Sequence, residues 1–147
     1  MLKLIRRRTE NGQRDEKGQA LVEFALLVPI FLILLFAIVD FGMGFHSWIT
    51  VTNSAREGAR LGAVQATTLQ IETRVRDTAT LINEDTNMTV TVTNAADNGG
   101  DPGESVVVQV DYDYDLITPL ASLVAFLSGD TLGPTLELSS TAEMRLE

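Results

Sequence analysis

The sequence predicts an α+β protein: one long N-terminal helix, then a small antiparallel three-stranded sheet packed with short helices. A long apolar run near the N-terminus predicts the helix. Three later segments alternate apolar and polar residues, as half-buried strands do. Turn residues separate the first two of these segments, so we expect antiparallel strands joined by loops.

The apolar run is long enough to cross a membrane. Residues Phe24 to Val39 carry no charge, and Phe41 to Phe45 continue the apolar character. Counted from residue 19 to 45, the run would form about 40 Å of helix, enough to span a bilayer. No small-residue cleavage site follows it, so we expect residues 19–45 to be a retained transmembrane segment. Pro29 predicts a bend in this helix.

Charge is distributed unevenly along the chain. Residues 1–17 carry a net charge of +3, and the rest of the chain carries −12. A basic head before an apolar run predicts a cytoplasmic N-terminus and a body outside. The acidic body lacks the basic surface that nucleic acid requires. Cysteine is absent, which excludes disulfides and thiolate metal sites.

Two carboxylates interrupt the apolar character in different ways. Asp40 lies near the outer end of the run, where we expect water and lipid headgroups to solvate it. Glu23 has apolar residues on both sides. An acid within a membrane segment indicates a functional role, because its burial in hydrocarbon is costly.

Glu23 belongs to a recognisable motif. The string GQALVEF, from Gly18 to Phe24, resembles the processing site of type IV-like prepilins of the tight adherence (Tad/Flp) system. The string NSAREGARLGA, residues 53–63, resembles the stretch after the membrane helix in TadE-like minor pilins. The closing LSSTAEMRLE is similar to their last strand, and residues 106–147 as a whole resemble them loosely. TadF-like proteins share the N-terminal pattern, but the Arg-Glu-Gly run favours TadE.

The resemblance implies cleavage between Gly18 and Gln19, which would remove a basic leader, residues 1–18. Glu23 would become the fifth residue of the mature chain, with Phe24 beside it in the assembly motif. In such filaments the glutamate meets the N-terminal amine of a neighbouring subunit and sets the register between subunits. Cyclisation of Gln19 would remove that amine.

The resemblance also implies a function. A minor pilin or pseudopilin takes part in assembling or priming a pilus used for adhesion and surface attachment. Its expected partners are prepilin peptidase, other pilin or pseudopilin subunits, the inner-membrane assembly platform and the lipid bilayer. Its expected location is the bacterial inner membrane, with entry into an extracellular pilus left open. The alternative is an uncleaved single-pass membrane protein whose outer domain binds a partner or ligand.

The predicted helix continues beyond the membrane, so that residues 19–66 form one element. Small residues recur on one face at spacings of three and four, and these are Ala55, Gly58, Ala59 and Gly62. Such a face allows close packing, either on the protein's own sheet or on another subunit. Glu57 and Arg60 are spaced to pair across one helical turn.

Residues 67–147 are expected to form the extracytoplasmic α+β domain. A second helix is predicted from Thr67 to Ile82, with a capping box of Thr67 and Gln70. Strands are predicted in residues 87–94 and 105–115, joined by a long, mobile loop, and a short helix follows Pro119. In a last strand, Thr135 to Leu146, the inward residues are expected to be Leu136, Leu138, Ala142, Met144 and Leu146.

Asp111, Asp113 and Asp115 share the polar face of one predicted strand. Carboxylates are the ligands that calcium prefers, and the loop acids Asp97 and Asp101 could join them. A solvated face is the simpler interpretation, so these residues are only a weak calcium candidate. The single histidine, His46, stands beside Trp48 at the expected membrane edge. No catalytic motif is present, so we expect neither a cofactor nor enzymatic activity.

Overall fold

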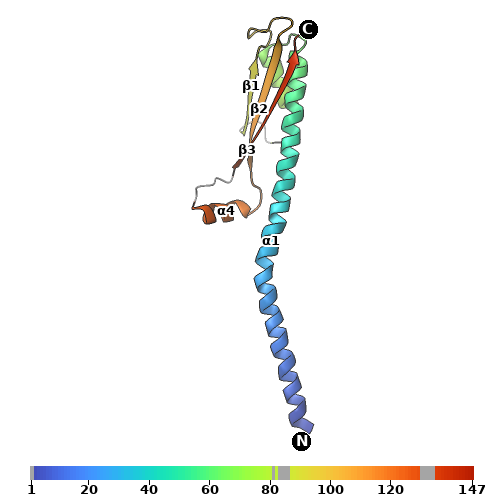
Figure 1. Ribbon diagram of the computed structural model, residues 1–147, viewed down its shortest axis with the longest axis vertical. Coiled ribbons are helices and arrows are strands. Elements are labelled where there is room, and N and C mark those ends of the chain that lie inside the picture. Colours follow the sequence, from blue (N-terminus) through green and yellow to red (C-terminus); the bar gives the residue numbers. More distant parts are fainter. Residues whose placement is uncertain (1, 81, 83–86, 130–134) are drawn as a thin grey trace. The chain divides into compact units, whose positions relative to one another are not determined.

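The computed structural model describes residues 2–80, 82, 87–129 and 135–147, with side chains from Gly18 onward except at positions 124, 127 and 128. Its elements are α1 (Leu2–Gly62), α2 (Thr68–Thr78), β1 (Met88–Thr93), β2 (Ser105–Asp115), α4 (Leu120–Ser128) and β3 (Thr135–Arg145) (Figure 1). This arrangement confirms the predicted α+β class. The chain forms two compact units, Met1–Ile38 and Val39–Glu147, and each is described by itself.

Helix α1 differs from the prediction at both ends. It already includes the leader residues from Leu2, continues through Pro29 and ends at Gly62 instead of residue 66. The chain turns here because Gln65 adopts a left-handed conformation with φ of 64°. The amide of Gln65 donates to the carbonyl of Gly62, and the amide of Glu147 donates to the carbonyl of Ala63. The C-terminus of the chain therefore holds the turn that ends α1.

The sheet is antiparallel with β2 in the centre, in the order β1-β2-β3. The predicted alternation of β1 and β2 is confirmed, because their inward residues are buried or half-buried: Met88, Val90, Val92, Val106, Val108, Val110, Tyr112 and Tyr114. In β3, Leu138, Ala142 and Met144 pack against this core. Leu136 was predicted to point inward, but it is 53% exposed. It lies at the start of an edge strand, one strand beyond the buried Tyr114.

The second unit, Val39–Glu147, is called the body from here on. Its core lies between β2, α2 and the outer part of α1, residues 50–62. Several of its side chains are completely buried, among them Val51, Ala55, Ala59, Ile71, Val75, Val106 and Val108. The capping box of Thr67 and Gln70 is present and begins α2 as predicted. The predicted end at Ile82 is wrong, since α2 stops at Thr78 and the amide of Ile82 instead closes a turn onto the carbonyl of Ala79.

The β1–β2 loop is held by more contacts than its composition indicates. The amide of Gly100 donates to the carbonyl of Ala95, and a side chain at Gly100 would lie 2.2 Å from the carbonyl oxygen of Asn94. Asp97 accepts hydrogen bonds from the amide and the hydroxyl of Thr68, at 2.7 and 2.8 Å. The Thr68 amide, followed by its hydroxyl, lowers the pKa of Asp97. These contacts argue against the expected mobile loop.

Candidate assembly site on the long helix

The expected processing site lies on an exposed part of α1. Gly18 and Gln19 are both exposed, and a side chain at Gly18 would meet nothing within 4 Å. The side-chain amide of Gln19 donates to Oε1 of Glu23 at 2.9 Å. Glu23 is also exposed. Its hydrogen-bond partner Gln19 lies one helical turn away, as the spacing of four residues allows.

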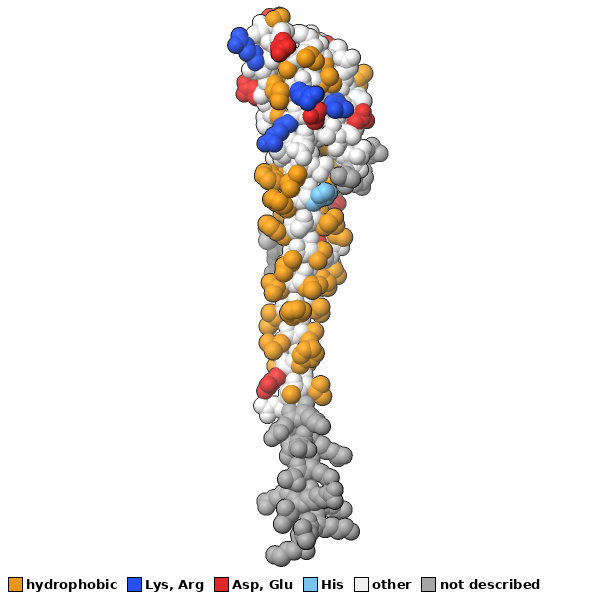
Figure 2. All heavy atoms as spheres, turned by 90° about the vertical axis from the view of Figure 1, so that its right-hand side faces the viewer, with side chains coloured by type: hydrophobic (Ala, Val, Ile, Leu, Met, Phe, Trp, Pro, Cys, Tyr) orange, Lys and Arg blue, Asp and Glu red, His pale blue; other side chains and the backbone are white. Residues whose placement is uncertain are grey.

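Around and beyond Glu23, α1 exposes large apolar side chains. Leu21, Phe24, Leu26 and Phe31 are each at least 65% exposed. In Figure 2 hydrophobic side chains gather along α1, whereas charged ones gather over the body. The stretch 18–62 meets the length and composition requirements of a membrane-spanning helix. Large apolar residues on all sides are typical of a helix in an apolar environment, so the first half of this stretch is compatible with a membrane span.

Asp40 corrects the expectation of an interfacially solvated carboxylate. Its side chain is only 3% exposed. Oδ1 accepts hydrogen bonds from the amides of Ile117 and Thr118, at 3.0 and 3.2 Å, and Oδ2 accepts one from the Thr118 hydroxyl. The Tyr114 hydroxyl donates to the backbone carbonyl of Asp40 at 3.4 Å. Asp40 thus ties α1 to the turn before α4.

Aromatic side chains follow Asp40 along α1. The rings of Phe41 and Phe45 stack with centroids 6.5 Å apart, and those of Phe45 and Trp48 lie 5.7 Å apart. All three side chains are exposed by more than two-fifths. Within this row, Trp48 is of a residue type that is enriched at the level where a membrane meets water.

The small-residue face of α1 packs on the protein's own body. Ala55 and Ala59 are fully buried. A Cβ added at Gly58 would lie 2.5 Å from Cγ2 of Val75, and one at Gly62 would lie 2.9 Å from Cγ2 of Val106. Of the two packing partners left open by the sequence, the structure shows the protein's own sheet and α2.

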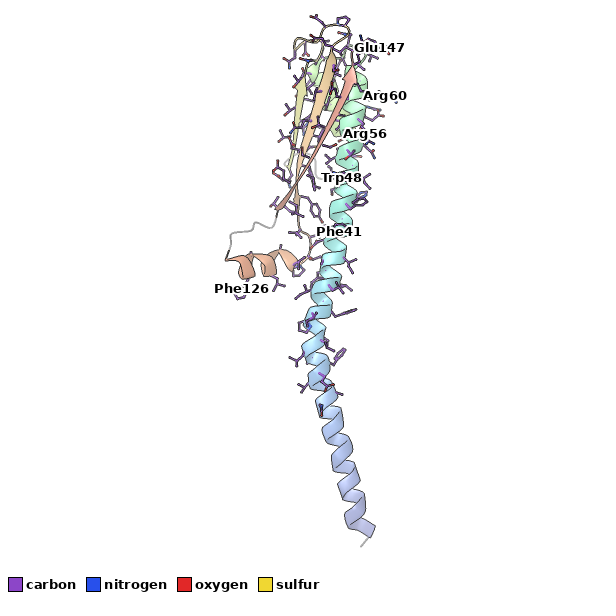
Figure 3. The ribbon with its side chains drawn as sticks, viewed as in Figure 1. Phe41, Trp48, Arg56, Arg60, Phe126 and Glu147 are labelled. Carbon is purple, nitrogen blue, oxygen red and sulfur yellow. The ribbon has the colours of Figure 1, made fainter. Side chains whose placement is uncertain are left out.

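Charged residues next to this face make surface contacts. The predicted pair of Glu57 and Arg60 is present at 3.7 Å, and Arg74 of α2 also reaches Glu57 at 3.2 Å. Arg56 and Arg60 lie on the side of α1 away from the sheet (Figure 3). These contacts link α1 to α2 and form no recognisable catalytic arrangement.

Two of the three carboxylates on the acidic strand accept hydrogen bonds from neighbouring side chains. Asp111 accepts hydrogen bonds from Gln109 and Ser139, and Asp115 accepts them from Asn87 and Thr135. Asp97 is engaged with Thr68. In the parts of the chain that the structure describes, no group of three or more acidic, histidine or cysteine residues could hold a metal ion. The weak calcium candidate Asp111, Asp113 and Asp115 therefore gains no support.

Comparisons with known proteins bear on the helix alone. No curated protein and no solved structure matches the chain. A family model does match, at residues 18–60, which include the GQALVEF motif and most of the NSAREGARLGA stretch. The match does not extend to the loosely similar residues 106–147. The matching model is that of the TadE-like proteins, so residues 18–60, within α1, are similar to this family.

Proposed function

We propose that the chain is a minor pilin or pseudopilin that is cut after Gly18 and takes part in assembling or priming a Tad/Flp-type pilus. The TadE-like stretch associates the chain with this pilus system. One observation supports the finer proposal most directly: the family match begins at residue 18, the residue after which cleavage is expected. Residues 1–17 of the leader lie outside the match, and only its last residue, Gly18, lies inside it.

The chemistry of Glu23 supports a role in assembly. A carboxylate in hydrocarbon is costly unless a positive or hydrogen-bonding group is close to it. In the uncut chain the Gln19 side chain offers a neutral donor to Glu23. Cleavage would add a cationic α-amine at Gln19. We propose that Glu23 of one subunit pairs with this amine on its neighbour, which favours one stagger between subunits over others.

The proposed setting follows from the charge pattern. The N-terminus lies in the cytoplasm of a bacterial cell, α1 crosses the inner membrane once, and the acidic body lies outside. Prepilin peptidase, other pilin subunits and the assembly platform are the proposed partners. The role is structural and involves no catalysis by this chain. Entry of the subunit into the pilus would link it to adhesion and surface attachment.

Piliation of the native host tests the proposal. Glu23→Ala is expected to leave processing and membrane insertion intact and to abolish or strongly reduce pilus assembly, because only the pairing is lost. Glu137→Ala, on the exposed surface of β3, is the matched control and should leave piliation unchanged. Gly18→Leu should block cleavage and keep the chain in the inner membrane. Normal piliation by an uncut Gly18→Leu chain would refute the proposal.

A further inference from the structure

Helix α4 carries an apolar surface that the body leaves open. Its sequence, LASLVAFLS, contains no charged residue. Phe126 is 83% exposed, and Ile117 in the turn before the helix is 63% exposed. Figure 3 shows Phe126 on the side of α4 that faces away from the sheet. These two exposed apolar side chains are available for a contact, and a phenylalanine side chain alone can bury about 150–250 Å².

The start of α4 is fixed to α1. The carboxylate of Asp40 holds the amides of Ile117 and Thr118, as described above. The Thr118 hydroxyl donates to Asp40 and accepts a hydrogen bond from the amide of Leu120, the first residue of α4, at 3.3 Å. One threonine therefore connects the first turn of α4 to a buried acid of α1.

The position of Asp40 along α1 decides what surrounds α4. The uncharged run ends at Val39, and Asp40 follows it directly. Phe41, Phe45 and Trp48 then form the exposed aromatic row. If α1 spans the membrane as proposed above, this is the level at which hydrocarbon gives way to headgroups. The tie to Asp40 holds the first turn of α4 at that level.

We infer that α4 lies in the outer interface of the lipid bilayer and is a second membrane contact of this protein. The inference rests on the proposed membrane span and adds a separate site to it. Interfacial helices bury their apolar side about 5–10 Å into the boundary of headgroups and acyl chains. Phe126 and Ile117 supply apolar side chains for this contact, and no charge on α4 opposes it. Lipid is the occupant we propose because the first turn of α4 is tied to Asp40, which directly follows the uncharged run.

A second contact has a mechanical consequence. A body attached to the bilayer through one helix can tilt about that helix. With α4 also in the interface, the orientation of the body toward the membrane is fixed before assembly. Transfer of the subunit into a pilus then requires that α4 leaves the lipid, together with α1.

Tryptophan fluorescence of the full chain in phosphatidylcholine vesicles tests the inference. Trp48→Phe removes the native tryptophan, and Phe126→Trp adds a reporter on α4. Matched reporters are Phe31→Trp in the proposed span and Leu69→Trp on α2, at positions 65% and 72% exposed. Each reporter is measured with brominated phosphatidylcholine, which quenches from the lipid, and with acrylamide, which quenches from water.

We expect brominated lipid to remove most of the fluorescence of the reporters at positions 126 and 31, and acrylamide to quench mainly the reporter at position 69. Adding Asp40→Ala should make position 126 more accessible to acrylamide. Quenching of position 126 by acrylamide as strongly as position 69 would overturn the inference while the span stands. Protection of position 126 from both quenchers would overturn it too, since a protein would then cover α4. Failure of lipid quenching at position 31 would refute the span itself, and the inference with it.

Discussion

Two parts of helix α1, residues 18–38 and residues 50–62, differ in the size and the exposure of their side chains. Between residues 18 and 38 the helix carries leucine, isoleucine and phenylalanine on its outside, and most of these side chains are exposed. Between residues 50 and 62 it carries alanine, glycine and serine on one face, and Ser54, Ala55 and Ala59 have no exposed surface at all. Large apolar residues all round are typical of a helix in an apolar environment, whereas small residues on one face let a sheet approach closely.

The two acids of the run show the same contrast. Glu23 is exposed, and its hydrogen-bond donor is a side chain four residues away. Asp40 is buried, and its donors lie 77 and 78 residues away in the chain. The exposed carboxylate of Glu23 is accessible to a partner, whereas the carboxylate of Asp40 is buried and bonded within its own chain. Residue type alone does not distinguish them.

Adding volume to a glycine should affect only the outer part of α1, and this is the largest effect we expect. Gly58→Leu would press against Val75 and Val108, which lie 2.5 and 3.2 Å from an added Cβ. We expect a loss of about 1–3 kcal/mol in unfolding free energy, because the core has no room. Gly42→Leu, where an added Cβ meets nothing within 4 Å, is the control and should cost nothing. Thermal unfolding in detergent micelles, followed by circular dichroism, measures both. Equal losses would contradict the close packing of the small-residue face at Gly58.

Replacing Asp40 and Glu23 one at a time should show that the two acids contribute differently to the unfolding free energy. Asp40→Ala leaves the part-buried amides of Ile117 and Thr118 without their acceptor, and an unsatisfied buried donor costs about 1–3 kcal/mol. Because water can reach these amides in part, we expect a loss toward the lower end of that range. Glu23→Ala removes an exposed side chain and should change stability by less than about 0.5 kcal/mol. Denaturant unfolding of the two variants in the same detergent compares them. A destabilisation by Glu23→Ala that matches Asp40→Ala would show that Glu23 is a structural acid.

A smaller effect at neutral pH than that of Gly58→Leu or Asp40→Ala is expected at Tyr114, whose ring packs on Gly44 of α1. Burial, followed by the negative charge of Asp40, raises the pKa of Tyr114 above its ordinary value of 10.0. Above pH 10 the unfolded chain therefore loses this proton more readily than the folded chain does, and stability falls as the pH rises. Tyr114→Phe should reduce this alkaline loss and cost about 0.5–1.5 kcal/mol at pH 7. Unfolding measured between pH 7 and 11 tests it, and an unchanged alkaline slope in the variant would contradict the raised pKa.

Local patterns predicted the elements that depend on neighbouring residues. The alternation of β2 gave its bounds of Ser105 and Asp115, and the capping box at Thr67 gave the start of α2. The features that local patterns did not predict depend on contacts between residues far apart in the chain. The end of α1 depends on the amide of Glu147, and the loop after β1 depends on Thr68 holding Asp97. No pattern near Asp40 indicates its partners at Ile117 and Thr118.

The same difference between local patterns and long-range contacts applies to the candidate site. Gly18, Gln19 and Glu23 form a linear motif, so the sequence alone suggested them as candidates. The spacing of four residues could also have predicted the bond between Gln19 and Glu23. The packing partner of Gly58 and Gly62 could not be predicted, because a small-residue face fits a sheet of the same chain as well as a second subunit.

Processing is the central claim, and the intact mass and N-terminal sequence of the protein from its native membrane test it most directly. A mature chain that begins at Gln19, or at its cyclised form, is the predicted result. It would make the pairing of Glu23 with a neighbouring N-terminus the next question. A chain that still begins at Met1 would contradict the account and favour an uncut membrane protein with an external binding domain.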